Sequence, residues 1–275
     1  MDFWRLTEPE GTSSQDHATH RNGLPGIECS ACKETHGGVR VLPYKIPKCL
    51  EADPNFSTPR TVSSEIHRSL RTQLADALNE EHQGLPLFTS DAFRPGDSFC
   101  PLEIQKIGKS RPDFLWFDFP VVSRRVKELL TPLVNKSVHF EKVSLKHGTV
   151  RKLSQYLNFE YYEMVILNNS KPPPGANLVY RCPECFLETY ANDRLDIQLV
   201  MTDEMRPQCP IFLWFDSLYV VIDDEIKRAV EESGFTNCDF IKFPKEQFLF
   251  PKKKGNFVLL QRDGTHRLMF DDNFL

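Results

Sequence analysis

The sequence predicts an α+β protein in which a mixed sheet carries a duplicated strand–helix–strand unit. The first observation is an internal repeat, because the pentapeptide FLWFD at residues 114–118 returns letter for letter at residues 212–216. The second is that each copy leads into two adjacent valines, a segment with helical spacing of its apolar residues, and a short run suited to a strand. The third is a CxxC motif in each half of the chain, and the two motifs are expected to meet in the folded protein.

The two predicted units have matching helices. The helical segment is SRRVKELLTPLV at residues 123–134 in the first unit and DDEIKRAVEESGF at residues 223–235 in the second. Ser123, and Asp223 or Asp224, stand where an N-cap residue belongs. The apolar face is formed by Val126, Leu129, Leu130 and Leu133 in the first helix and by Ile226, Ala229 and Val230 in the second. Two units are too few for a solenoid, so they are expected to flank a shared core. Chance similarity of two amphipathic helices is the alternative.

The remaining elements are less regular. Apolar residues at helical spacing predict a helix over residues 61–79, with Ser63 or Ser64 as its N-cap. Residues 83–112 contain four prolines and are expected to form an irregular connector or a partly extended segment rather than a separate domain. Strands are expected within residues 39–44 and 156–167, and in a C-terminal hairpin over residues 257–270 that turns at Asp263-Gly264.

Three segments are expected to form one compact domain. Residues 1–60 are an N-terminal segment with the first CxxC motif, and residues 61–110 hold the helix and the connector. Residues 111–275 are the repeat-bearing α/β part with the second CxxC motif.

The composition excludes several classes of protein. The chain has 275 residues, of which 40% are hydrophobic and 26% charged, which is ordinary for a globular protein. A net charge of −4 supplies no global basic field, so nucleic acid is not an expected partner. The N-terminus does not resemble a signal peptide, and no apolar run reaches the length of a membrane helix. We therefore expect a cytoplasmic protein without a membrane partner.

The cysteines are expected to bind metal. Disulfides are rare in a reducing compartment, and cysteines at CxxC spacing there more often hold a metal ion. A CxxC turn directs two thiolates at one ion, and two such turns complete a tetrahedral zinc site. We predict a zinc-ribbon-like pair of CxxC knuckles that holds one structural Zn²⁺ through Cys29, Cys32, Cys182 and Cys185.

Three other interpretations of the motifs remain open. A site at a single knuckle is possible, completed by His17 and His20 or by His36. The two pairs could also lie together without metal. A redox function is disfavoured, because a thioredoxin-like CxxC needs a strand before it and a helix N-terminus behind it. Pro25-Gly26 ahead of the first motif and KPPPG ahead of the second do not provide that context.

The sequence contains no common catalytic motif. GxGxxG, GxxxxGK[ST], GxSxG and HExxH are all absent. A zinc ion held by four thiolates has no open coordination position and does not activate water. The protein is therefore expected not to be an enzyme.

The motifs resemble a known family. Residues 21–32 (RNGLPGIECSAC), the RCPEC motif at residues 181–185 and residues 212–243 are similar to the bacterial double-CXXCG family. Its members are immunity proteins of polymorphic or contact-dependent toxin systems. The resemblance covers most of residues 1–50 and 110–245. It implies that the four cysteines correspond to the paired cysteines of the family. Lys33 and Phe186 replace the glycine that follows each pair.

The resemblance implies a binding function without catalytic turnover, in which the protein neutralises a cognate toxin. An acidic surface would suit a basic nuclease toxin, since charge complementarity speeds association. Such a surface would be formed by Asp223, Asp224, Glu225, Glu231 and Glu232. The alternative function is a zinc-ribbon protein that acts in nucleic-acid transactions. That alternative predicts clustered Lys and Arg near the knuckles, and the group of Arg40, Lys45 and Lys48 is the only hint of such a cluster.

Overall fold

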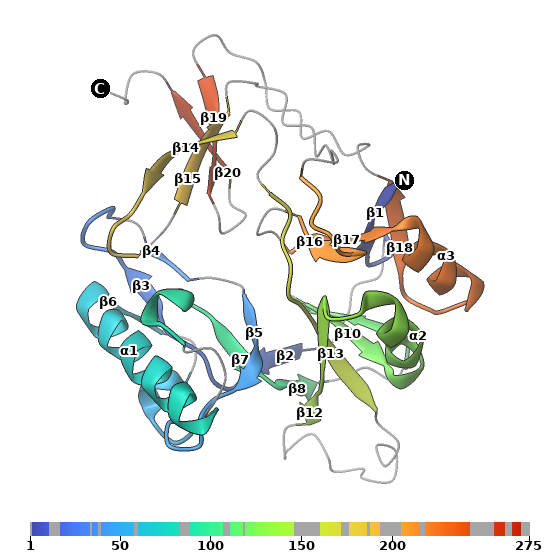
Figure 1. Cartoon of the computed structure of the whole chain (residues 1–275), viewed down its shortest axis with the longest axis horizontal. Helices are drawn as coiled ribbons and strands as arrows, with labels where there is room; N and C mark the ends of the chain where they lie inside the picture. The colour runs from blue at the N-terminus through green and yellow to red at the C-terminus, as the bar shows by residue number, and fades with distance from the viewer. Residues whose placement is uncertain are drawn as a thin grey trace.

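The fold combines helices with several small sheets (Figure 1). A computed structural model describes residues 2–10, 17–33, 35–37, 40–57, 60–82, 88–106, 111–117, 119–145, 160–171, 176–185, 188–192, 205–214, 218–242, 256–261 and 266–270. Within these residues lie three α-helices, α1 (Ser64–Glu81), α2 (Arg124–Val134) and α3 (Asp224–Glu232). Two short 3₁₀ turns, η1 (Pro54–Phe56) and η2 (Ser90–Ala92), accompany them. The predicted mixture of helix and sheet is confirmed.

Two antiparallel sheets have the same strand order. The first consists of β9 (Phe114–Trp116), β10 (Pro120–Ser123), β13 (Tyr161–Ile166) and β11 (Val138–Lys142), and its hairpin leads into α2. The second consists of β16 (Ile211–Leu213), β17 (Val220–Asp223), β1 (Phe3–Thr7) and β18 (Asp239–Lys242), and its hairpin leads into α3. In the first sheet, the strand beside the hairpin comes later in the chain. In the second, that place is taken by β1, which precedes the other described strands in the chain.

The two helices begin in the same way. The Ser123 hydroxyl accepts a hydrogen bond from the backbone N–H of Val126, and the Asp223 carboxylate accepts from the N–H groups of Glu225 and Ile226. Both predicted N-caps are confirmed. A second shared feature is a cation–π contact on each helix. The Lys127 Nζ lies 3.8 Å from the ring centroid of Tyr162 on β13, and the Lys227 Nζ lies 4.4 Å from that of Trp4 on β1.

The identical pentapeptides do not occupy identical structural positions. Phe114 pairs with Val122 in the first hairpin, whereas in the second hairpin Ile211, not Phe212, pairs with the matching residue Ile222. A shift of one residue turns each side chain to the opposite face of the sheet. Phe114 therefore enters the core shared by the two helices, while Phe212 packs against Phe3 at a centroid distance of 6.0 Å. The likeness of the two segments resides in the second hairpin strand, the helix and the last strand.

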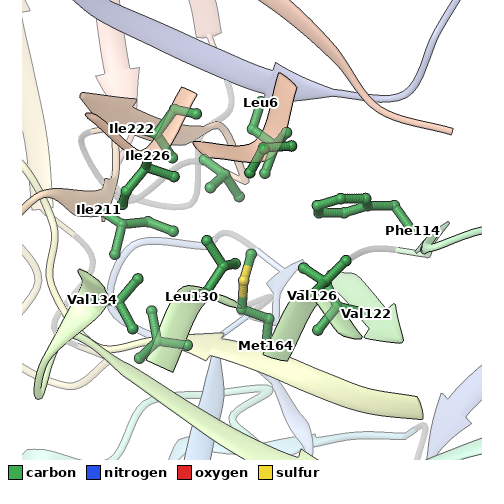
Figure 2. Packing of buried hydrophobic residues seen from close by; sticks show 13 residues of the cluster. Leu6, Phe114, Val122, Val126, Leu130, Val134, Met164, Ile211, Ile222 and Ile226 are labelled. Carbon is green, nitrogen blue, oxygen red and sulfur yellow. The ribbon is translucent and has the colours of Figure 1, made fainter. Parts of the chain in front are cut away.

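One hydrophobic core joins both sheets and both helices, as Figure 2 shows. Val126 and Leu130 of α2 and Ile226 and Val230 of α3 are at most 1% exposed, in agreement with the predicted apolar faces. The core is completed by Leu6, Phe114, Val122, Val134, Val138, Met164, Ile211, Val220 and Ile222. Burial on this scale is the main source of stability for such a structure, at about 25 cal/mol per Å² of apolar surface.

The N-terminal part has its own core beneath α1. Helix α1 starts after Ser63, whose hydroxyl accepts from the N–H of Ile66, so the predicted N-cap is confirmed. It packs on Leu24, Phe56, Phe93 and Phe99, among others. The strands of this part are β2 (His17–His20), β3 (Gly26–Glu28), β4 (Thr35–His36), β5 (Val41–Lys45), β6 (Thr61–Ser63), β7 (Ser98–Cys100), β8 (Leu102–Lys106) and β12 (Ser144–Leu145).

The segment over residues 83–112 contains more regular structure than the predicted irregular connector. The described residues of this segment include β7 and β8, and β8 pairs with both β2 and β12. Leu102 and Ile104 are buried, while the alternating residues Glu103 and Gln105 are not. This two-residue alternation is typical of a half-buried strand, but it is too short to stand out among the surrounding prolines.

A buried histidine–carboxylate contact connects the N-terminal part to the first sheet. His20 on β2 places its Nε2 2.6 Å from the Oε1 of Glu163 on β13, and the Glu163 side chain is fully buried. The other carboxylate oxygen accepts from the backbone N–H of Leu102, at 3.1 Å. The neighbouring Cys100 thiol is also buried, and its pKa is raised by burial and by the Glu163 charge. The pKa shift keeps this thiol protonated and unsuited to act as a nucleophile.

A further four-stranded sheet lies apart from these cores. It contains β14 (Ala176–Arg181), β15 (Glu188–Asn192), β19 (Asn256–Gln261) and β20 (His266–Phe270), in that order. The antiparallel pair β19 and β20 confirms the strands of the predicted C-terminal hairpin, while Asp263-Gly264 lie outside the described residues. Across all described residues, no helix is both long and apolar enough to cross a membrane.

Candidate metal centre

Each CxxC motif follows a strand of an antiparallel strand pair. The first motif follows β3, and β4 pairs back onto that strand, with Glu28 opposite Thr35. The second follows β14, and β15 pairs back with Arg181 opposite Glu188. A tight turn after a strand brings two cysteines three residues apart onto the same side of the chain, which is what a tetrahedral ion requires.

The structure brings all four predicted cysteines together. Their sulfur atoms lie within 4.8 Å of one another. The two motifs are 153 residues apart, yet the Cys29 and Cys182 sulfurs are 3.5 Å apart and the Cys32 and Cys185 sulfurs 3.7 Å apart. Zn–S bonds of about 2.3 Å in tetrahedral geometry place sulfurs about 3.8 Å apart. None of the four cysteines is in a disulfide bond. The spacing is far longer than a disulfide bond of about 2.05 Å, and it fits one ion.

The site is almost closed to solvent. Cys29, Cys182 and Cys185 are at most 3% exposed, and Ile27 packs beside them. Burial raises the pKa of Cys182, but hydrogen bonds from the backbone N–H groups of Cys185 and Glu184 outweigh it and bring this pKa down to about 6. Metal binding requires the thiolate form, so these N–H groups prepare the site for an ion.

Lys33 takes the backbone conformation that explains why a glycine is common at this position. Its φ angle is 61°, in the left-handed region, and its N–H donates to the Cys29 carbonyl at 2.9 Å. A residue with a Cβ atom is strained there by about 1 kcal/mol, whereas glycine is not. The turn therefore forms despite the missing glycine. Phe186, the second departure, lies outside the described residues.

Lys33→Gly is expected to stabilise the protein by about 1 kcal/mol, because it removes left-handed strain from the first knuckle. Lys33→Ala is the matched control, since it also removes the cation but keeps the Cβ atom. Denaturant unfolding of the zinc-loaded proteins measures both. Equal stabilities of the glycine and alanine variants would contradict the assignment of strain to Lys33.

Polar side chains within the motifs tie the two knuckles together. The Ser30 hydroxyl donates to the Glu184 carboxylate at 2.9 Å, and the Ser30 N–H reaches the Ser64 hydroxyl at 3.5 Å. Hydrogen bonds from Ser64 and Ser30 lower the pKa of Glu184. The carboxylate thus lies beside the first turn of α1, where a negative charge is favourable. Sequence reasoning missed these residues, although Ser30 and Glu184 stand between the paired cysteines.

Two longer side chains complete the surroundings. The Tyr180 hydroxyl hydrogen-bonds to Cys182, and this bond is the largest cause of the rise in the Tyr180 pKa to about 12. The Arg71 guanidinium, on α1, is 3% exposed and interacts electrostatically with Cys185. A four-thiolate zinc site remains doubly anionic, so a hydroxyl donor and a nearby cation both stabilise it.

His17 and His20, two of the histidines considered as alternative ligands, are not part of the cluster. Among the described side chains, the four cysteines are the one group with suitable spacing for a metal ion. His17 and His20 lie on β2, where His20 is bound to Glu163. The side chain of His36 lies outside what the structure describes.

A scan against protein-family models and a search of curated proteins both give no match for this chain.

Proposed function

We propose that the protein is an immunity-type binding protein that neutralises a cognate bacterial toxin and is stabilised by a structural zinc ion. The proposal of a zinc ion rests on the closed four-cysteine cluster. Its four thiolates would hold Zn²⁺ and leave no position for water or substrate, so it supplies rigidity rather than catalysis. The toxin-binding function rests on the resemblance of residues 21–32, 181–185 and 212–243 to the double-CXXCG family.

Two finer points belong to the same proposal. The strand pairs that carry the knuckles support the description of the site as a zinc ribbon whose halves are separated by a long insertion. The common strand order, N-caps and lysine–aromatic contacts support an origin of the two sheet–helix units by duplication. The one-residue shift of the pentapeptide means that duplication rests on these features and not on the repeated letters.

The acidic surface expected on α3 is smaller than its sequence implies. Asp223 is 4% exposed and serves as the N-cap. Asp224 accepts hydrogen bonds of 2.8 Å from the Trp4 indole and from the Asp2 N–H. Glu231 pairs with Lys227. The described acids therefore give little support to a specifically basic toxin, and the proposal leaves the chemistry of the toxin open.

The nucleic-acid alternative loses its main motivation. The Arg40 guanidinium binds the fully buried Asp97 carboxylate through two nitrogens, and Lys45 forms an ion pair of 3.1 Å with Glu141. Cations held in such pairs contribute less to a basic surface for phosphates.

Co-expression tests the immunity function. A toxin encoded beside the gene for this protein is expected to stop growth when expressed alone, and co-expression of this chain is expected to restore it. The purified pair should form a complex, since the proposal assigns protection to direct binding. Toxicity that persists despite soluble protein would contradict the proposal. The metal content of the purified chain, expected at about one zinc per chain, tests the site separately.

A further inference from the structure

The hairpin of β14 and β15, which we call the arm, leaves the sheet–helix units and returns at one point. The Lys171 N–H donates to the Met205 carbonyl at 2.9 Å, so residues 171 and 205 meet at the base of the arm. Between them the chain runs along β14 to the second knuckle and back along β15. The arm also carries the C-terminal hairpin, since β19 pairs with β15. Figure 1 shows this sheet set apart from α2 and α3.

The tip of the arm is held by the four-cysteine cluster. The two cross-knuckle sulfur contacts, at 3.5 and 3.7 Å, join it to the first knuckle. The Ser30–Glu184 hydrogen bond lies beside them. By contrast, Leu178 and Tyr180, the apolar side chains of β14 that the structure describes, are 50% and 43% exposed rather than buried. Among the described helices and strands, β14, β15, β19 and β20 make their extensive contacts with one another.

We propose that metal occupancy controls the docking of the arm onto the N-terminal part. Zinc bound to the four cysteines fastens the tip, and its loss frees the tip while the base and both sheet–helix units stay folded. The physical reason is that Leu178 and Tyr180 of the arm are exposed, whereas the described residues of the shared core and of the α1 core bury one another. The C-terminal hairpin then follows the arm. This inference rests on the proposed zinc site but not on the proposed toxin binding.

Hydrogen exchange of the full-length, zinc-loaded protein tests the inference, with EDTA as the chelator. Zinc removal is expected to raise exchange at residues 29–33 and 182–185 by about tenfold or more, because these amides then open without disrupting either core. Amides of α2 and α3 should keep their protection. The three tryptophans, Trp4, Trp116 and Trp214, all lie in or directly beside strands of the two units, so their fluorescence should also stay constant.

Each other result overturns the inference. Unchanged exchange at both knuckles after complete zinc removal would mean that other contacts hold the tip. Increased exchange throughout α2 and α3 would mean that zinc supports the whole fold. A purified chain without zinc would contradict both the inference and the proposed zinc site. None of these results affects the growth assay with the toxin, which tests the immunity function separately.

A pair of variants isolates the contact beside the metal. Glu184→Gln keeps all four cysteines, so zinc should remain at about one per chain while exchange at the knuckles rises severalfold. Glu65→Gln is the control, since Glu65 is an exposed acid on the first turn of α1. Identical exchange in the two variants would exclude the Ser30–Glu184 bond from the docking.

Discussion

Replacing Cys29 or Cys182 by serine is expected to abolish zinc binding and to destabilise the two knuckles and the docked arm by several kcal/mol, while α2 and α3 keep their protection from hydrogen exchange. Serine is a poor zinc ligand, and the three remaining thiolates would stay buried around an incomplete site. Structural zinc contributes folding free energy directly, with about 10–16 kcal/mol of apparent binding free energy in small zinc peptides. A loss of several kcal/mol corresponds to a drop of roughly 10 °C in the first thermal transition of a chain this long.

The matched control is Cys49→Ser, because Cys49 is exposed and stands outside the cluster. Its zinc content and melting temperature should equal those of the wild type. Metal analysis and calorimetry on the same preparations give both readouts. A wild type that is equally stable with and without a full complement of zinc would contradict the structural role assigned to the cluster.

Glu163→Ala is expected to cost about 3–5 kcal/mol, because it removes two hydrogen bonds to a buried charged group, each worth about 1.5–3 kcal/mol. The carboxylate is fully buried between His20 and the Leu102 N–H, so its removal takes away both contacts and leaves a cavity. Denaturant unfolding measures the change in the free energy of unfolding.

Glu160→Ala is the control for Glu163→Ala. Glu160 precedes the same strand and pairs with Arg124, but its side chain is 38% exposed. Surface pairs of this kind contribute about 0–1 kcal/mol. Glu163→Gln should fall between the two, since it keeps the shape and removes the charge. Equal costs for Glu160→Ala and Glu163→Ala would show that burial does not distinguish the two pairs.

Local patterns predicted the helices and the cluster because each depends on neighbouring residues. Ser63, Ser123 and Asp223 cap their helices by bonding backbone groups two or three residues ahead, so the signal lies within one turn. The CxxC spacing likewise encodes each knuckle. That the two knuckles meet followed from the chemistry of zinc, which needs four ligands.

The missed features depend on distant residues. Glu163 carries no local sign that it will meet His20, which is 143 residues away. The β8 alternation of Leu102 and Ile104 gains its meaning from pairing with β2 and β12. The two FLWFD segments differ by one residue in strand register. Identical residues do not fix the register, because it is set by the turn and by the face that is buried.

The place of β1 has a consequence for how the chain is made. Residues 3–7 are synthesised long before their partners on either side, residues 220–223 and 239–242. At synthesis rates of about 5–20 residues per second, the strand waits on the order of 10 s or longer before it can pair. Throughout that time Phe3 and Leu6, both buried in the finished protein, have no completed second sheet to enter. Nascent chains are therefore expected to depend on chaperones that bind exposed apolar segments. A tag fused ahead of residue 2 is expected to slow the pairing of β1 with β17 and β18.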